Sequence, residues 1–236
     1  MTGEALTTVT LCRYEGAQRL WAFSQMGTSR RVLALTDGLR FWKLLGTGHG
    51  RGFSLRPDFS QYGLLGVWAS RQAADRFISS SSLMQEYRRR SSECWTVWLE
   101  PYDSRGAWDG SNPFVPSALR ARPGPVAVLT RASIRWSQLR NFWAAVPSTM
   151  PGLDQAPGLL ASVGTGETPI VRPATFSLWR SEEDLVRYAY GDPNHAEVIR
   201  RRADERWYSE ELFARFAPLQ SEGTWKGRDP FAGLLQ

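Results

Sequence analysis

The sequence carries one set of landmarks twice, in the same order along the chain. The tripeptide Gly-Thr-Gly occurs at 46–48 and again at 164–166, and a Gly-x-Trp triplet occurs at 106–108 and again at 223–225. The other paired landmarks are Trp68 with Trp179, Trp95 with Trp207, and the arginine triplets 88–90 and 200–202. So many matches in one order indicate an internal duplication, and we expect two copies of one folding unit.

Hydrophobic alternation and helix-start signals predict the same order of elements in both copies. Strands are expected at 8–14, 39–45, 61–68 and 95–100, and again at 126–132, 159–163, 175–179 and 212–216. Helices are expected at 17–25, at 70–90 with Ser70 as N-cap, at 137–145, and after a capping-box-like start at Ser181 and Asp184. The order βαββαβ is that of a ferredoxin-like unit.

A single ferredoxin-like unit has an open sheet face, which a tandem copy covers within the same chain. We therefore predict an α+β fold in which tandem ferredoxin-like βαββαβ repeats form a pseudo-dimeric α+β barrel with its helices outside. The expected divisions are a first repeat at 1–108, a linker rich in Pro and Gly at 109–125, a second repeat at 126–225 and a tail at 226–236.

The composition is that of an ordinary folded protein, with 42% hydrophobic and 22% charged residues. No apolar run approaches the roughly 18 residues that a membrane helix needs. The N-terminus lacks the pattern of a signal peptide, and two cysteines are too few for a disulfide framework. We expect a cytoplasmic protein in a reducing compartment.

Tryptophan is unusually frequent, with 11 among 236 residues. Because tryptophan supplies a large flat apolar surface at low entropic cost, the enrichment fits a cavity for a planar or elongated ligand. It fits an aromatic-rich core equally well, and the composition leaves both interpretations open.

The net charge of +6 arises from scattered arginines rather than from a dense basic face or a recognisable nucleic-acid-binding module. A nucleic-acid partner is therefore not expected. A basic surface also suits an acidic protein partner or an anionic cofactor such as one that carries propionates. The adjacent Glu210 and Glu211 stand among surface-like residues and give no specific signal of acid–base chemistry.

The glycine-rich stretch GTGHGRGF at 46–53 resembles a phosphate-binding loop only superficially. It lacks the Lys-Ser/Thr ending of a P-loop, and no helical pattern follows its glycines. We expect it to form a wide turn between two strands.

The chain has two histidines, His49 and His195, too few for a tetrahedral zinc site. His195 follows Gly-Asp-Pro-Asn, where Asn194 is a natural N-cap, and the equivalent place in the first copy is occupied by Leu83 or Met84. A histidine that replaces an apolar residue in one copy indicates specialisation. Haem iron needs one axial imidazole, an apolar slot and cations for the propionates, so His195 is a candidate haem ligand. The alternative is a histidine on the surface or in the core with no ligand.

Several segments together resemble the spheroidene monooxygenase family, although no one of them is diagnostic. These segments are 40–44 with the Gly-Thr-Gly that follows, 93–97, 124–132, 175–179, 210–216 and 222–225. The resemblance extends over nearly the whole chain. It implies an enzyme with haem b that adds a C2 keto group to an acyclic carotenoid, using dioxygen and electrons from reduced ferredoxin. The family looks related to aldoxime dehydratases, in which a histidine of the C-terminal half binds iron, and this carries over to His195 as the axial ligand.

The resemblance leaves the catalytic residues unassigned. His49 and Arg131 are candidates for the distal side of the haem, and Cys12 or Cys94 as a thiolate ligand is a further alternative. Different chemistry on the same fold, such as aldoxime dehydration, and a non-catalytic protein that binds haem or a polyene also stay open. The protein could reach so apolar a substrate by associating with a membrane. The oligomeric state stays open, and a homo-oligomer is one of the alternatives.

Overall fold

The computed structural model describes residues 6–116, 123–168, 170–191 and 205–235. Eight antiparallel strands form a closed barrel in the order β1-β3-β2-β6-β7-β5-β8-β4. The strands are β1 Leu6–Arg13, β2 Leu39–Gly48, β3 Pro57–Trp68, β4 Glu93–Gly106, β5 Val126–Ile134, β6 Leu159–Thr168, β7 Arg172–Trp179 and β8 Tyr208–Gly223. The prediction of an α+β barrel is confirmed, and each expected strand is present.

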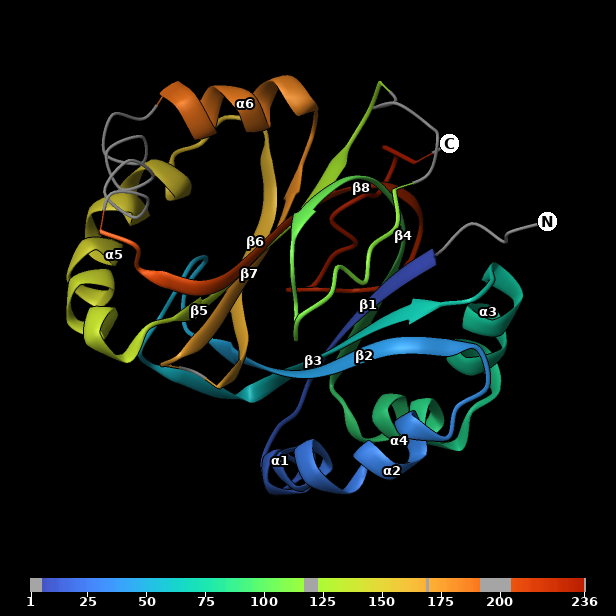
Figure 1. Ribbon diagram of the computed structural model, residues 1–236. Helices are drawn as coiled ribbons and strands as arrows, with labels where there is room; N and C mark the ends of the chain where they lie inside the picture. Colours follow the sequence, from blue (N-terminus) through green and yellow to red (C-terminus); the bar gives the residue numbers. More distant parts are fainter. Residues whose placement is uncertain (1–5, 117–122, 169, 192–204, 236) are drawn as a thin grey trace.

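The helices lie outside the barrel, in two groups on opposite sides (Figure 1). The first group is α1 Gln18–Thr28, α2 Arg30–Ala34, α3 Arg71–Ser80 and α4 Ser82–Arg90, and the second is the 3-10 turn η1 Trp136–Gln138 with α5 Leu139–Asp154 and α6 Glu182–Gly191. The first group covers the sheet of the first half, and the second group covers the sheet of the second half.

A pseudo-twofold axis relates the two halves, and it passes through the two seams where they meet. At one seam Thr47 pairs with Thr165, and these are the central residues of the two Gly-Thr-Gly motifs. At the other seam Glu100 of β4 pairs with Ala217 of β8. The β2–β6 seam is short, because only two residue pairs join it, whereas the β4–β8 pairing extends along most of both strands.

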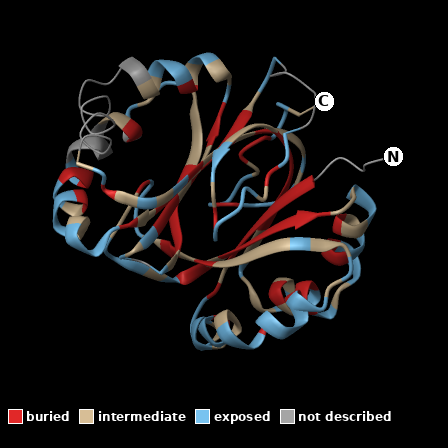
Figure 2. Cartoon of the chain, viewed as in Figure 1, coloured by how far each residue is buried: buried red, intermediate tan, exposed pale blue. Residues whose placement is uncertain are grey.

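The barrel interior is filled by inward-facing apolar side chains from all eight strands, and Figure 2 shows the buried strands at the centre of the molecule. Tryptophan dominates the buried volume of the protein. Seven of the 11 tryptophans are at most 3% exposed, namely Trp68, Trp95, Trp98, Trp108, Trp179, Trp207 and Trp225. This supports the simpler interpretation of the tryptophan content, as an aromatic-rich core.

Two segments turn back into the barrel after β4 and β8. Trp108 and Phe114 fill one end of the interior, and Trp225 and Phe231 fill the other. Each tryptophan forms an isolated bridge with the residue three positions later, Ser111 or Arg228. The duplicated Gly-x-Trp triplets therefore mark equivalent plugs, which appear in green and red within the ring of strands in Figure 1.

Two sequence-based expectations were wrong in detail. The helix expected at 70–90 is two helices, because Ser81 is extended (φ −69°, ψ 140°) and its hydroxyl caps α4 by accepting the N–H of Met84. Trp95 and Trp207 are not equivalent, since Trp95 faces the barrel interior whereas Trp207 packs under α5. Leu212 occupies the position of Trp95 in the second half.

Among the described residues, none of the helices is long and apolar enough to cross a membrane.

Candidate functional site

The structure places the sequence-predicted residues in different parts of the molecule. His195 lies outside the described residues. Leu83 and Met84, its suggested counterparts, are buried in the apolar layer between α4 and the sheet of the first half. His49 lies in the loop 49–56 between β2 and β3, which forms the turn that the glycine-rich stretch predicted.

Arg131 is only 1% exposed and lies inside one end of the barrel. It projects inward from β5, as Leu129 does two residues earlier, because alternate residues of a strand share a face. One guanidinium nitrogen donates to Glu210 of β8, and Nη2 lies 3.6 Å from Glu167 of β6. Among the described residues, Nε and Nη2 have no hydrogen-bond acceptor.

The same end contains a second cation, Lys43 of β2. Its ammonium group donates to Asp109, and to Glu167 at 2.7 Å. The indole N–H of Trp108 donates to the other oxygen of Glu167 at 2.8 Å. This network closes the end of the barrel, which we call the closed end.

Hydrogen bonds and charge stabilise the ionised acids of this network. Burial opposes ionisation of Glu210, but hydrogen bonds from the N–H groups of Gly110 and Asp109 and the charge of Arg131 together lower its pKa. The pKa of Asp109 is also lowered: burial raises it, but the hydrogen bond from Lys43 and the charges of Lys43, Arg172 and Arg131 together outweigh burial. The expectation that Glu210 is an ordinary surface residue was wrong. Inward-facing charges at strand positions otherwise occupied by apolar residues are the signal that could have revealed this network.

An apolar groove of about 220 Å³ lies along the short β2–β6 seam. Both Gly-Thr-Gly motifs line it, at 46–48 and 164–166, together with Phe23, Phe53 and Phe59. Of the four glycines, Gly46 leaves open space beside the seam, because the atom nearest to a Cβ built on it is 3.9 Å away. Phe23 and Phe59 are 58% and 57% exposed at the groove, with ring centroids 6.2 Å apart. The groove therefore offers an apolar ligand a partly open surface lined with aromatic rings.

The loop 49–56 crosses from the first half onto the second. Ser162 of β6 donates to the carbonyl oxygen of Arg51 at 2.6 Å, and Phe53 contacts Phe142 of α5 with centroids 5.4 Å apart. The backbone of Gly52 lies directly on Gly164, where a Cβ atom would overlap the carbonyl oxygen of Gly52. The Gly-Thr-Gly motif at 164–166 therefore packs against the loop 49–56, which follows the Gly-Thr-Gly motif at 46–48.

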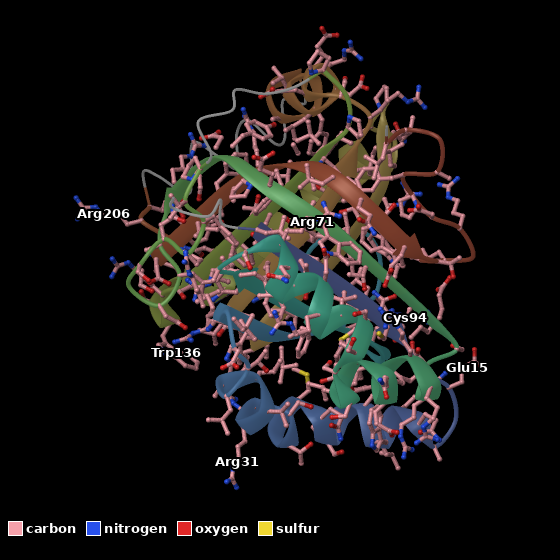
Figure 3. All side chains as sticks on the ribbon, turned by 90° about the vertical axis from the view of Figure 1, so that its right-hand side faces the viewer. Glu15, Arg31, Arg71, Cys94, Trp136 and Arg206 are labelled. Carbon is pink, nitrogen blue, oxygen red and sulfur yellow. The ribbon has the colours of Figure 1, made fainter. Side chains whose placement is uncertain are left out.

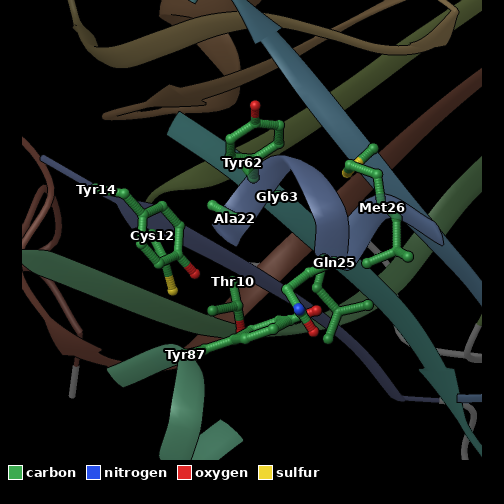
Figure 4. Close-up of a pocket in the computed structure, with 11 residues that line it drawn as sticks. Thr10, Cys12, Tyr14, Ala22, Gln25, Met26, Tyr62, Gly63 and Tyr87 are labelled. Carbon is green, nitrogen blue, oxygen red and sulfur yellow. The ribbon is translucent and has the colours of Figure 1, made fainter. Parts of the chain in front are cut away.

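The two helix–sheet layers differ in how they are filled. In the first half, the cavity between α1 and the sheet measures only about 20 Å³, and Tyr14, Tyr62 and Tyr87 surround it (Figure 4). Such a space holds about one water molecule. Cys12 lines this cavity and pairs across the strands with Cys94, whose side chain lies beside α3 and α4 in Figure 3.

In the second half, the sheet face turned toward α5 and α6 carries small polar side chains. Thr175 and Ser177 of β7 are half-buried on this face, because their neighbour Phe176 faces the barrel interior. Among the described residues, the buried hydroxyl of Tyr102 and the buried Nε of Arg215 have no hydrogen-bond partner. Buried polar atoms of this kind ordinarily meet an acceptor or donor. The same layer also contains a buried apolar cluster that includes Val128, Trp179 and Leu185.

No protein-family model matches the sequence. Among solved structures, an aldoxime dehydratase is similar with a TM-score of 0.61 and 13% identity, covering 91% of this chain and 81% of that one. An aldoxime dehydratase crystallised with butyraldoxime gives a TM-score of 0.63 and 10% identity, covering 97% of this chain and 84% of that one. The chain thus has the tandem α+β-barrel architecture of these enzymes, and at such low identity the likeness concerns the fold alone.

The sequence relatives are closer. A spheroidene monooxygenase from Rubrivivax gelatinosus is 41% identical, over 90% of this chain and 81% of the relative. Spheroidene monooxygenases from Cereibacter sphaeroides and Rhodobacter capsulatus are 35% and 34% identical over 98% of this chain, and the match covers 72% and 97% of their own lengths. This chain belongs to the spheroidene monooxygenase family.

Proposed function

We propose that this protein is a haem-dependent monooxygenase that adds a keto group at C2 of an acyclic, spheroidene-like carotenoid. The observation that carries the proposal is the identity of 34–41% with three spheroidene monooxygenases over at least 90% of the chain. Dioxygen supplies the oxygen atom, and reduced ferredoxin or a similar donor supplies the electrons.

The apolar groove at the β2–β6 seam supports a substrate of this class. An acyclic carotenoid has almost no polar handle, so its binding energy comes from apolar burial, at about 25 cal/mol per Å². Phe23, Phe53 and Phe59 offer that surface, and Gly46 presents no side chain that would keep a flat chain from the backbone. The partly exposed aromatic rings would also receive a substrate delivered from a membrane.

The second helix–sheet layer is the place that we assign to haem. His195, which follows α6 in the chain, would be the axial ligand. The small side chains of Thr175 and Ser177 and the unpartnered polar atoms of Tyr102 and Arg215 fit a planar group with a polar edge. Bound haem would supply the activation of dioxygen. The corresponding layer of the first half is closed, since its cavity of about 20 Å³ has no room for such a group.

The positive charge of the protein supports an acidic electron donor. The formal net charge is +6, and complementary charge accelerates the encounter between redox partners. Electron transfer from an acidic ferredoxin should therefore slow as ionic strength rises.

The chain's two histidines provide a matched experiment. Protein purified from haem-supplied cells should show a Soret absorption band, which His195→Ala should shift or abolish and His49→Ala should leave in place. Absence of the band in the native protein would refute haem dependence. A band that His195→Ala leaves unchanged would refute the ligand assignment alone.

The reaction is tested with the same preparation. Incubation with an acyclic carotenoid, dioxygen, reduced ferredoxin and its reductase should yield a 2-keto product that carries oxygen from labelled dioxygen. Conversion of an aldoxime to a nitrile instead would assign the dehydratase chemistry. Binding of haem and carotenoid without turnover of either substrate would point to a carrier protein.

A further inference from the structure

The two ends of the barrel are related by the duplication but are built differently. The segment Leu129-Thr130-Arg131 of β5 corresponds to Leu11-Cys12-Arg13 of β1, so that each end has one inward-facing arginine. The tryptophans of the plugs, Trp108 and Trp225, also correspond. The residue after the Gly-Thr-Gly motif does not: it is Glu167 at the closed end and His49 at the opposite end, which we call the open end.

At the closed end, the carboxylate of Glu167 lies between three donors. It accepts the indole N–H of Trp108 at 2.8 Å and the ammonium of Lys43 at 2.7 Å, and lies 3.6 Å from a guanidinium nitrogen of Arg131. At the closed end, the position of the Glu167 side chain therefore holds a carboxylate, which accepts an indole N–H and lies beside two cations.

At the open end the equivalent carboxylate is missing. His49 occupies its place in the sequence, and the Trp225 indole, 3% exposed, has no hydrogen-bond acceptor for its N–H among the described residues. Trp225 corresponds to Trp108 in the duplication, and His49 corresponds to Glu167, which accepts the Trp108 N–H. A buried indole N–H without an acceptor is destabilising, so an acceptor there would stabilise the protein.

A pocket of about 490 Å³ opens at this end, and it is lined by His49, Arg13, Arg19, Lys226 and Asp58 among others. Three cations thus face one carboxylate. Asp58 is already engaged by the hydroxyl and N–H of Ser60, and its oxygen lies 3.5 Å from the Arg13 guanidinium.

The remaining acid near the pocket is also committed. Glu93 accepts the N–H groups of Lys226 and Gly227. Burial, with the positive charges of Arg51 and Arg13, lowers the pKa of Lys226, although Asp58 and Glu93 oppose the shift.

We propose that the open end binds the carboxylate group of a small anion, in the position that the Glu167 side chain fills at the closed end. The ligand would accept the Trp225 N–H and pair with Arg13 and Lys226. The pocket extends from this position to the surface, so it accepts a molecule larger than the carboxylate itself.

Calorimetric titration and tryptophan fluorescence of the full-length protein test the proposal, with acetate, succinate and inorganic phosphate as probes at fixed ionic strength. Succinate or acetate should bind saturably, with one site per chain, and raise the thermal midpoint. Phosphate that binds while both carboxylates fail would overturn the assignment to carboxylates, and no saturable binding of any probe would overturn the site.

Exchange of the two equivalent residues gives a sharper test. His49→Glu should supply the carboxylate from within the chain, raise the thermal midpoint without added anion, and weaken succinate binding at least about tenfold. Arg13→Gln should weaken binding comparably, and since it also removes the hydrogen bonds of Arg13 to Ser60 and Gln61, its thermal midpoint without anion is measured alongside. Unaltered succinate binding in both variants would refute the location of the site.

The closed end provides the reciprocal control. Glu167→His should lower the thermal midpoint and create a second anion site, so that succinate partly restores the lost stability. If Glu167→His fails to fold, the His49→Glu and Arg13→Gln results still decide the proposal.

Discussion

Glu93 and Glu210 occupy equivalent positions at the starts of β4 and β8, and each binds the turn that follows the other's strand. Glu210 accepts the N–H groups of Asp109 and Gly110, just beyond β4, and Glu93 accepts those of Lys226 and Gly227, just beyond β8. Through these hydrogen bonds, each segment that carries a plug tryptophan is bound to a strand of the opposite half. The two acids differ in what else they contact, because only Glu210 also receives a buried arginine.

This difference predicts unequal costs for the same substitution. Glu210→Gln leaves Arg131 buried with an incomplete set of acceptors and should lower the free energy of unfolding by about 3 kcal/mol. Glu93→Gln removes charge from hydrogen bonds at an exposed turn and should cost only about 1 kcal/mol. Urea unfolding of both variants measures the contrast, and equal losses would show that the Arg131 contact contributes little.

The closed end also predicts a loss of stability in acid. The pKa values of Asp109 and Glu210 are lower in the folded protein than in the unfolded chain, so the unfolded state binds more protons as the pH falls. Their stabilising contribution is complete above the unfolded values of about 4 and disappears as the pH falls through the depressed folded values. Native protein should thus lose more unfolding free energy than Glu210→Gln across that window. If the unfolding free energies of the native protein and of Glu210→Gln depended on pH in the same way, the lowered pKa of Glu210 would be contradicted.

The loop contact on the second Gly-Thr-Gly motif predicts an asymmetry between equivalent glycines. Gly164→Ala places a Cβ against the carbonyl of Gly52 and should cost about 1–3 kcal/mol or displace the loop. Gly46→Ala is the matched control, since the nearest atom to its Cβ is 3.9 Å away. Thermal unfolding measures the cost, and faster tryptic cleavage at Arg51 or Arg56 in Gly164→Ala alone would report the displaced loop.

The cysteine pair predicts two rates of thiol alkylation. Cys12 is 2% exposed, and burial followed by its hydrogen bond with Cys94 raises the pKa of its thiol well above the usual value. Because the thiolate is the reactive form, Cys12 should react with iodoacetamide at least about tenfold more slowly than Cys94. Cys94→Ser should leave only the slow phase, and both thiols should react rapidly in denaturant. A single fast phase in the folded variant would contradict the burial of Cys12.

The apolar groove predicts an effect on substrate affinity if the proposed function holds. Phe23→Ala and Phe59→Ala remove aromatic surface from the groove and should each raise KM for the carotenoid by roughly 3–10-fold with little change in kcat. Leu35→Ala, just after α2, is the control, because Leu35 is 73% exposed and is not among the residues that line the groove. A drop in kcat at constant KM would show that these rings act in the catalytic step rather than in substrate binding.

Much of this architecture could be predicted because it depends on local patterns. Alternating apolar residues located all eight strands, and the repeated landmarks predicted two related halves and a barrel. The split at Ser81 was missed because the surrounding sequence is compatible with a continuous helix, and only the extended backbone of one serine interrupts it. The assignment of Trp207 as the partner of Trp95 failed because spacing alone cannot tell an inward from an outward position.

The sequence by itself determined the duplicated unit and its strands. The substitution that makes the two barrel ends unequal, histidine for glutamate after Gly-Thr-Gly, was recognised only once the structure showed what Glu167 contacts. The tertiary structure alone decided what that substitution means. Barrel closure brings Lys43, Trp108 and Arg131 from separate segments around Glu167, and it brings Trp225 and Arg13 to the end where His49 stands in the place of that glutamate. Such contacts join residues far apart in the chain, and they exist only once the strands have closed into a ring and the register fixes which side chains point inward.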